Sequence, residues 1–190
     1  MALPATQPVF TLEAFLDWEA LQADKHEYWK GEVFAMTGAR QAHVLVALNV
    51  ASALKAHLRG TPCRAYISDM QLAVEQADAV FYPDVFVSCH PDDLSAERVL
   101  RHPRLIIEVL SESTAAYDRG EKFAACRSIP DLQEYVLIDP DSRRIDLFRR
   151  TEDDNWLLAI RDAERGLVLK SVDFIAGPDV VFESLPQAER

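Results

Sequence analysis

The chain has 190 residues, a length that suits one domain with a full hydrophobic core and leaves little for a second. Hydrophobic residues make up 49% of it, and 6 Gly and 10 Pro are too few for a disordered or fibrous chain. Because 20 Lys and Arg oppose 31 Asp and Glu, the net charge of −11 argues against tight nonspecific binding to a phosphate backbone. We therefore expect a single globular domain over residues 1–190.

Neither targeting nor disulfide signals stand out. Residues 1–8 lack the basic start and apolar stretch of a signal peptide, and no stretch has the apolar length that spans a bilayer. We expect a cytoplasmic protein without a membrane partner. Cys63, Cys89 and Cys126 are odd in number and lack CxxC spacing, so we expect reduced structural thiols rather than a disulfide framework or a zinc site.

The N-terminal part predicts a short helix, a hairpin and a long helix. Thr11 can cap a helix that runs to about residue 21. Residues 27–36 then suggest two short strands around a Lys-Gly turn. The long helix is expected over about 40–59, with one apolar stripe formed by Val44, Ala47, Leu48, Ala51, Leu54 and Leu58.

The rest of the chain predicts strands on both sides of a second helix. That helix is expected over about 118–127, with Asp118 as N-cap and Glu121 completing a capping box. Because strands and helices mix in this order, we expect an α/β core with a mixed sheet flanked by helices, in which the strands before and after the second helix run parallel through a right-handed crossover. The expected strands are 64–68, 71–75, 80–88, 104–110, 134–138, 144–149, 156–161 and 167–169.

One carboxylate, Glu108, interrupts the apolar run 105–110. A run of this composition is typical of a buried strand, and a buried carboxylate is costly unless a cation, a proton or hydrogen-bond donors meet it. The alternative is a strand-end glutamate paired with Arg104 or Arg119.

Asp84 and Lys122 extend this pattern. Asp84 follows Pro83 in a second strand-like run, where alternation places it on one face with Phe86; the alternative is a turn aspartate at a strand entrance. Lys122 lies in the first turns of the second helix, whose N-terminal dipole favours phosphate; the alternative is an exposed lysine paired with a nearby acid.

Two acids on neighbouring strands and a lysine suit metal-dependent phosphodiester hydrolysis. Mg²⁺ usually takes one or two carboxylates from a protein and the rest of its ligands from water and substrate phosphate. Such an ion would polarise the phosphate and ready a water for attack, which makes Asp84 and Glu108 the candidate metal ligands. Lys122 would orient or deprotonate that water and stabilise the extra negative charge.

Basic residues gather in two places and suggest local faces for a nucleic-acid strand, although each is equally consistent with a solvated rim. The clusters are Arg98, Arg101, His102 and Arg104, and Arg143, Arg144, Arg149 and Arg150.

Four motifs together resemble a known family. They are TyrProAsp at 82–84, IleGluValLeuSer at 107–111 with SerThr at 113–114, TyrAspArgGlyGluLysPhe at 117–123, and LeuGlnGluTyrValLeuIleAsp at 132–139. The set is similar to the Uma-two family of endonucleases in the PD-(D/E)XK, restriction-endonuclease-like superfamily, over about residues 10–184. The resemblance implies a mixed sheet flanked by helices, with Asp84 and Glu108 as metal ligands and Lys122 as the catalytic lysine.

The resemblance also implies supporting roles for Glu32 and His43. Glu32 would complete the metal shell, and His43 would touch phosphate or act as an acid-base group. From the residues alone, a structural histidine on the side of the apolar stripe is the more frequent outcome for His43, and the alternative for Glu32 is a turn residue.

Two positions depart from the commonest pattern. The superfamily lysine usually lies two residues after the acid, where this chain has Leu110, so Lys122 must reach the site from the helix, as the resembling family implies. Cys126 stands where that family often has Tyr, which removes any role of that ring.

We therefore expect a Mg²⁺-dependent endonuclease, with Mn²⁺ possible, that hydrolyses DNA and leaves a 5′-phosphate. We expect that the protein can form a homodimer, because an enzyme that cuts both strands of a duplex needs either two active sites or two successive binding events. The acidic charge favours an alternative, a noncatalytic homodimeric binding module with the same fold. A third reading is a hydrolase of RNA or of a small phosphoester that uses the same metal site.

Overall fold

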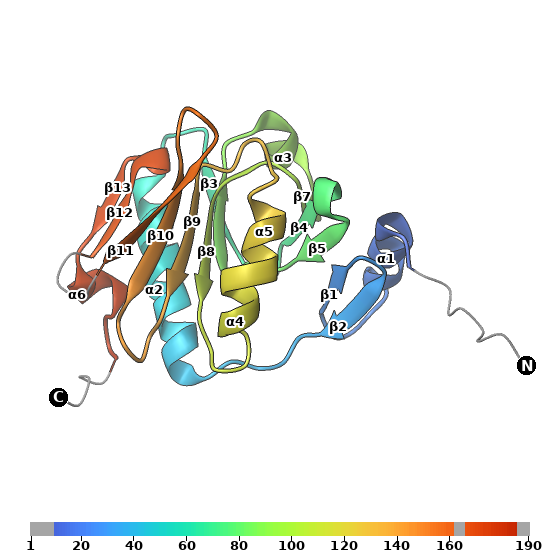
Figure 1. The fold of residues 1–190 in the computed structure, drawn as a ribbon, viewed down its shortest axis with the longest axis horizontal. Helices are drawn as coiled ribbons and strands as arrows, with labels where there is room; N and C mark the ends of the chain where they lie inside the picture. Colours follow the sequence, from blue (N-terminus) through green and yellow to red (C-terminus); the bar gives the residue numbers. More distant parts are fainter. Residues whose placement is uncertain (1–9, 162–165, 186–190) are drawn as a thin grey trace, which may run out of the picture.

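The computed structural model describes residues 10–161 and 166–185 (Figure 1). The first half contains α1 (Leu12–Glu19), β1 (His26–Trp29), β2 (Glu32–Ala35), α2 (Gln41–His57), β3 (Arg64–Ile67), β4 (Gln71–Val74), η1 (Glu75–Ala77), β5 (Ala79–Phe81), β6 (Val85–Ser88), α3 (Pro91–Ser95) and β7 (Val99–Leu100). The second half contains β8 (Pro103–Val109), α4 (Ala115–Tyr117), the π-helical turn η2 (Asp118–Lys122), α5 (Phe123–Cys126), β9 (Glu134–Ile138), β10 (Ile145–Arg150), β11 (Trp156–Arg161), β12 (Leu167–Leu169), η3 (Lys170–Val172), β13 (Phe174–Ala176) and α6 (Pro178–Val181).

These strands form mixed sheets flanked by helices, which confirms the predicted α/β class. A six-stranded sheet has the order β11-β10-β9-β8-β6-β3, a five-stranded sheet the order β2-β1-β5-β4-β7, and β12 pairs with β13. In the six-stranded sheet β8 is antiparallel to β6 and parallel to β9, as expected for strands on either side of the second helix. No helix in the described ranges is long and apolar enough to cross a membrane, and the N-terminal residues 1–8 considered above lie outside them.

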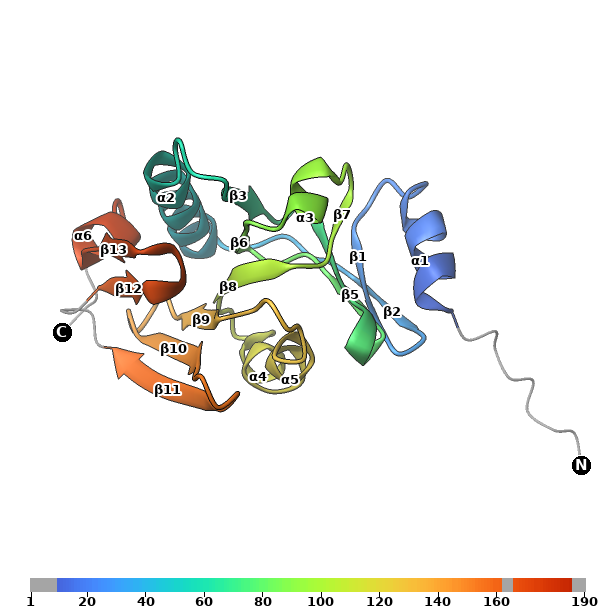
Figure 2. The same cartoon turned by 90° about the horizontal axis from the view of Figure 1, so that it is seen from above.

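Alternating side chains of the central strands face two different cores. Ile107 of β8 packs in one cluster with α2, whereas Ile106 packs in another with α5. Figure 2 shows α2 on one side of strands β8 to β10 and α4 and α5 on the other. Because Glu108 shares its parity with Ile106, its side chain projects toward the face that carries α4 and α5.

The N-terminal elements follow their local signals. Thr11 caps α1 by accepting a hydrogen bond from the Ala14 backbone, as predicted. The hairpin β1-β2 turns at Lys30 and Gly31, which both have positive φ of 47° and 93°. A positive φ is strained for most residues but not for glycine, which accounts for the glycine at position 31 of this turn.

The predicted apolar stripe of α2 was partly wrong. Val44 and Leu48 are 51% and 58% exposed, whereas Val46 and Val50 are buried. Apolar residues surround most of this helix, so the sequence pattern does not define one face, and the contact with the sheet selects it.

The predicted continuous strand 80–88 is two strands in two sheets. β5 pairs with β1 and β4, whereas β6 pairs with β3 and β8. The break falls at residues 82–84, where Pro83 lacks the N–H that a central strand needs. Asp84 lies in this break, directly before β6.

The predicted start of the second helix was also wrong. The helical segment begins at Ala115, and Asp118 is a buried residue inside it rather than an N-cap. Ser111 Oγ accepts from the Thr114 backbone at 3.3 Å, so the side chain of Ser111 caps the chain just before the helix.

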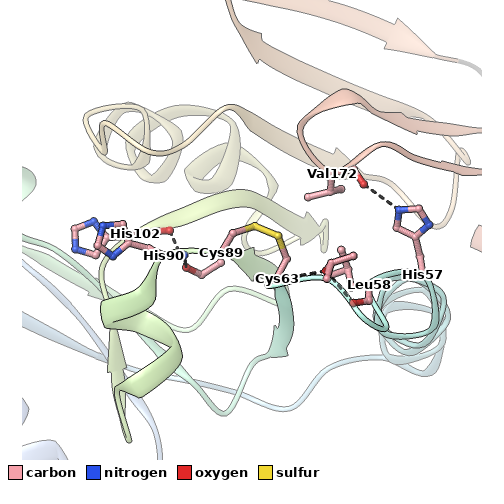
Figure 3. The surroundings of a disulfide bond; sticks show 9 residues. His57, Leu58, Cys63, Cys89, His90, His102 and Val172 are labelled. Carbon is pink, nitrogen blue, oxygen red and sulfur yellow. Dashed lines mark hydrogen bonds between the residues drawn. A yellow bond between two sulfur atoms is a disulfide. The ribbon is translucent and has the colours of Figure 1, made fainter.

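The cysteine prediction was wrong for two of the three residues. Cys63 and Cys89 form a disulfide with a Cα to Cα distance of 4.0 Å (Figure 3). Arg64 of β3 pairs with Ser88 of β6 in antiparallel register, so the residues flanking that pair face each other, which the sequence spacing alone does not show. Cys126 is free and buried.

Candidate metal centre

Asp84 and Glu108 lie side by side because β6 and β8 are neighbours in the sheet. Val85 pairs with Ile107, which brings the residue before β6 next to the residue after Ile107. The Asp84 backbone N–H donates to Glu108 Oε2 at 3.3 Å, and the Val109 N–H donates to Asp84 Oδ2 at 2.8 Å. The two predicted metal ligands are therefore adjacent.

Lys122 reaches these carboxylates from the helix. Its Nζ lies 3.0 Å from Glu108 Oε1 and 3.9 Å from Asp118 Oδ1, and its side chain is only 6% exposed. Lys122 and Asp118 occupy the two ends of the π-helical turn η2. π-helical turns often occur at functional sites, and both residues are buried here, four positions apart on one face of the helical segment.

His43 joins the cluster from the start of α2. Its Nε2 lies 3.1 Å from Asp84 Oδ2, and both side chains remain slightly exposed, at 17% and 18%. Burial lowers the pKa of His43, but the hydrogen bond and the charge of Asp84 outweigh burial and raise the pKa above its usual value. His43 and Asp84 thus lie on the more accessible side of the cluster.

Glu32 does not join the cluster. It is exposed at the start of β2, and within the described residues no ion pair links it to the other predicted site residues. Glu27 of β1 lies in the cluster instead: its Oε1 is 3.0 Å from Lys122 Nζ and accepts from the Tyr82 backbone at 3.2 Å.

Sequence reasoning therefore missed Glu27 and Asp118 as members of the cluster. The sequence holds a weak signal for Glu27: strand alternation places its side chain on the face of β1 opposite the buried Tyr28. Asp118 had a competing explanation as a helix cap, which concealed it.

The cluster has an excess of negative charge. Four carboxylates, those of Glu27, Asp84, Glu108 and Asp118, surround the ammonium of Lys122 and the imidazole of His43.

Burial raises the pKa of Glu108 well above its usual value, and the neighbouring acids Asp84 and Asp118 add to the effect against the opposing charge of Lys122. Burial lowers the pKa of Lys122, but the charges of Glu108 and Glu27 outweigh it and raise that pKa well above its usual value. Lys122 therefore stays charged, and a further cation would relieve the crowded carboxylates.

One oxygen indicates where such a cation fits. Glu108 Oε1 is buried, and the Lys122 ammonium faces it at 3.0 Å. One donor leaves part of the acceptor capacity of this buried oxygen unused, and a cation can take it up. Hard divalent cations prefer carboxylate oxygens, so the donor set of Asp84 and Glu108 fits a Mg²⁺-like ion.

The fold agrees with that of a solved structure. A crystal structure from Anabaena variabilis ATCC 29413, titled a "putative nuclease belonging to DUF820", matches with a TM-score of 0.74 at 19% identity, over 91% of this chain and 97% of that one. At this identity the match establishes the fold, which is that of a protein described as a nuclease.

The family follows from the sequence comparison. The model of the Uma2 family, described as "Putative restriction endonuclease", matches residues 12–177, and the chain belongs to this family. The predicted family is thus confirmed. Two similar proteins of Synechocystis sp. (strain ATCC 27184 / PCC 6803 / Kazusa) are named as uncharacterized: slr1290 is 35% identical over 94% of both chains, and sll1609 is 32% identical over 83% of this chain and 90% of its own.

Proposed function

We propose that this chain is a Mg²⁺-dependent endonuclease that hydrolyses DNA phosphodiester bonds with a metal-activated water, and that Mn²⁺ can replace Mg²⁺. Buried Glu108 carries the proposal, because its carboxylate lies beside Asp84 in a cluster of four acids that faces only one buried ammonium, that of Lys122. Membership of a family described as restriction endonucleases supports the same reaction.

Asp84 and Glu108 would hold the ion. Bound there, Mg²⁺ would polarise the scissile phosphate and lower the pKa of a water. The Val109 N–H fixes the Asp84 carboxylate, and the Asp84 N–H fixes that of Glu108, so the two ligands are held in place by backbone donors.

Lys122 and His43 would act on the substrate. Glu27 and Glu108 keep Lys122 charged and aimed at the metal ligands, so its ammonium can orient the attacking water and stabilise the negative charge of the transition state. His43, on the accessible side beside Asp84, can donate a hydrogen bond to a phosphate oxygen.

The proposal is tested by metal titration and plasmid nicking on the same preparations. Asp84→Asn/Glu108→Gln keeps the shape of both side chains and removes their charges. We expect isothermal titration of Mg²⁺ and Mn²⁺ into the wild type to give binding that the double variant lacks, and nicking to disappear with it. Glu32→Gln, on the exposed start of β2, serves as the matched control and should retain both.

Other outcomes favour other functions. The net charge of −11 favours a noncatalytic binding module, which a folded wild type that neither binds metal nor nicks DNA would indicate. If the wild type binds metal and cleaves RNA or bis-p-nitrophenyl phosphate but not DNA, the proposed metal site stands and the proposed substrate is wrong. We further propose that residues 1–190 act as one domain and that two copies assemble on duplex DNA, which sedimentation velocity with and without a duplex would test.

A further inference from the structure

A second group of metal-ligating side chains lies at the opposite end of the strand pair that carries Asp84 and Glu108. His90 follows the C-terminal end of β6, and His102 precedes the N-terminal end of β8. Because β6 and β8 are antiparallel, these ends meet at the edge of the sheet away from Asp84 and Glu108. Figure 3 shows the two imidazole rings side by side, beyond the disulfide at Cys89.

The three side chains converge closely enough to share one ion. The rings of His90 and His102 stack with centroids 4.0 Å apart and planes at 20°. One ring nitrogen from each and a carboxylate oxygen of Asp92 all lie within 4.8 Å of one another. Metal to ligand distances are about 2.0–2.2 Å, so the three side chains are close enough to share one ion once a ring rotates out of the stack and the ligand atoms converge.

Buried polar groups hold the two histidines in place. Ser88 is fully buried, and its Oγ donates to the His102 carbonyl at 2.9 Å and accepts from the His90 N–H at 3.2 Å. Asp93 is 2% exposed and accepts from the backbone N–H groups of Arg101 and His102 at 2.8 and 2.9 Å. The backbone of the cluster is therefore preorganised, and only side-chain rotations remain to be fixed.

His102 also has the outer partner that metal-binding histidines typically have. Its Nδ1 lies 2.8 Å from Asp131 Oδ2. When Nδ1–H of the neutral ring donates to that carboxylate, Nε2 keeps its lone pair for a metal. His90 Nδ1 accepts only a long hydrogen bond from the Asp92 N–H, at 3.3 Å, which a metal can displace.

We propose that His90, Asp92 and His102 form a second metal site for a divalent transition ion, with zinc as the reference ligand. Two imidazoles and one carboxylate suit Zn²⁺, Ni²⁺ or Cu²⁺ rather than Mg²⁺, which prefers oxygen ligands. The Asp92 side chain is 80% exposed, so water completes the coordination from the solvent side. The ion would join the start of α3 to the segment that enters β8.

The test uses the full chain in the Asp84→Asn/Glu108→Gln background, which removes the two proposed Mg²⁺ ligands from the first site. We expect isothermal titration with ZnCl₂ to give one bound ion, and Co²⁺ to give the visible absorption of nitrogen and oxygen coordination. His90→Ala, Asp92→Asn and His102→Gln should each weaken zinc binding by more than about 10-fold. Zinc should also raise the melting temperature of the background protein but not of these variants.

His57→Ala is the matched control, because His57 is an exposed histidine whose ring contacts the Val172 carbonyl at 2.9 Å outside the cluster. It should leave zinc affinity unchanged. Asp92→Asn alters only a side chain at the surface, so loss of binding in that variant does not reflect misfolding. Undiminished zinc binding in all three variants, or no zinc binding in the background protein, would overturn the second site without bearing on the proposed nuclease centre.

Discussion

At the scale of single residues, the hairpin places two glutamates on the same face but at different distances from the site. Glu27 pairs with Phe34, and Glu32 pairs with Trp29, so all four side chains share one face of the hairpin. Glu32 lies level with Trp29, about 7 Å further toward the turn than Glu27. Of these two glutamates, Glu27 is the one that contacts Lys122, at 3.0 Å.

The two glutamates therefore form a matched pair of variants. We predict that Glu27→Gln lowers plasmid nicking by about 10- to 100-fold, because Lys122 loses one of the carboxylates that orient it. Glu32→Gln should change the rate by no more than about twofold, as for surface substitutions in general. Equal losses in the two variants would contradict the assignment of Glu27 to the site.

Cys126 allows a test of burial that is independent of nuclease activity. Its side chain is fully buried, and burial raises the pKa of the thiol well above its usual value. Because the thiolate is the reactive form, we predict that iodoacetamide does not modify Cys126 at about pH 8 in the folded protein, and that guanidinium exposes it to rapid modification. Mass spectrometry of the native and unfolded protein measures this, and fast labelling of the native protein would be the contrary result.

At the scale of elements, local patterns predicted most strands and helices, while features that depend on distant pairing were missed. Strand β8 and helix α2 were predicted because their composition and spacing are local properties. The break at residues 82–84 was missed, although Pro83 signals it, because the flanking runs look like one strand until β5 and β6 pair in different sheets.

The site shows the same division. Asp84, Glu108 and Lys122 were selected from the sequence because a carboxylate in an apolar run is chemically unusual. Glu27 comes from a hairpin that reaches the cluster only through the pairing of β1 with β5, which no local pattern contains. Asp118 was misread because the helix was predicted to start there with Asp118 as N-cap, whereas the helical segment begins at Ala115 and buries Asp118 with Lys122.

The disulfide is the element-scale feature that most clearly depends on register, and its contribution to stability is measurable. Cys63 and Cys89 are separated by 26 residues and join the ends of β3 and β6. We predict that Cys63→Ser/Cys89→Ser lowers the free energy of unfolding by about 2–4 kcal/mol, because the bond restricts the unfolded chain. Urea unfolding followed by tryptophan fluorescence measures the change.

Reductant added to the wild type should reproduce most of this loss, whereas it should not affect the double variant further. A difference below about 0.5 kcal/mol between oxidised wild type and the double variant would contradict a stabilising restriction of the unfolded chain by the disulfide.

At the scale of the whole molecule, the charge distribution offers a phosphate backbone little attraction near the carboxylate cluster. Several arginines from the two basic clusters are already paired with acids of the same chain, which limits their attraction for phosphate. Arg101 pairs with Glu75, Arg144 with Asp146, Arg149 with Glu134 and Arg150 with Asp154. With a net charge of −11 in addition, a duplex approaching Asp84 and Glu108 is repelled unless a divalent ion offsets these charges.

This balance predicts that a divalent cation controls DNA binding as well as cleavage. In EDTA, fluorescence anisotropy of a labelled duplex should show no binding at moderate salt, and Ca²⁺, which takes oxygen ligands, should restore it. The dependence should disappear in Asp84→Asn/Glu108→Gln, because that variant loses both proposed ligands and two of the repelling charges. Strong binding of the wild type in EDTA would mean that a surface other than the carboxylate cluster holds the nucleic acid, since the cluster alone can only repel it.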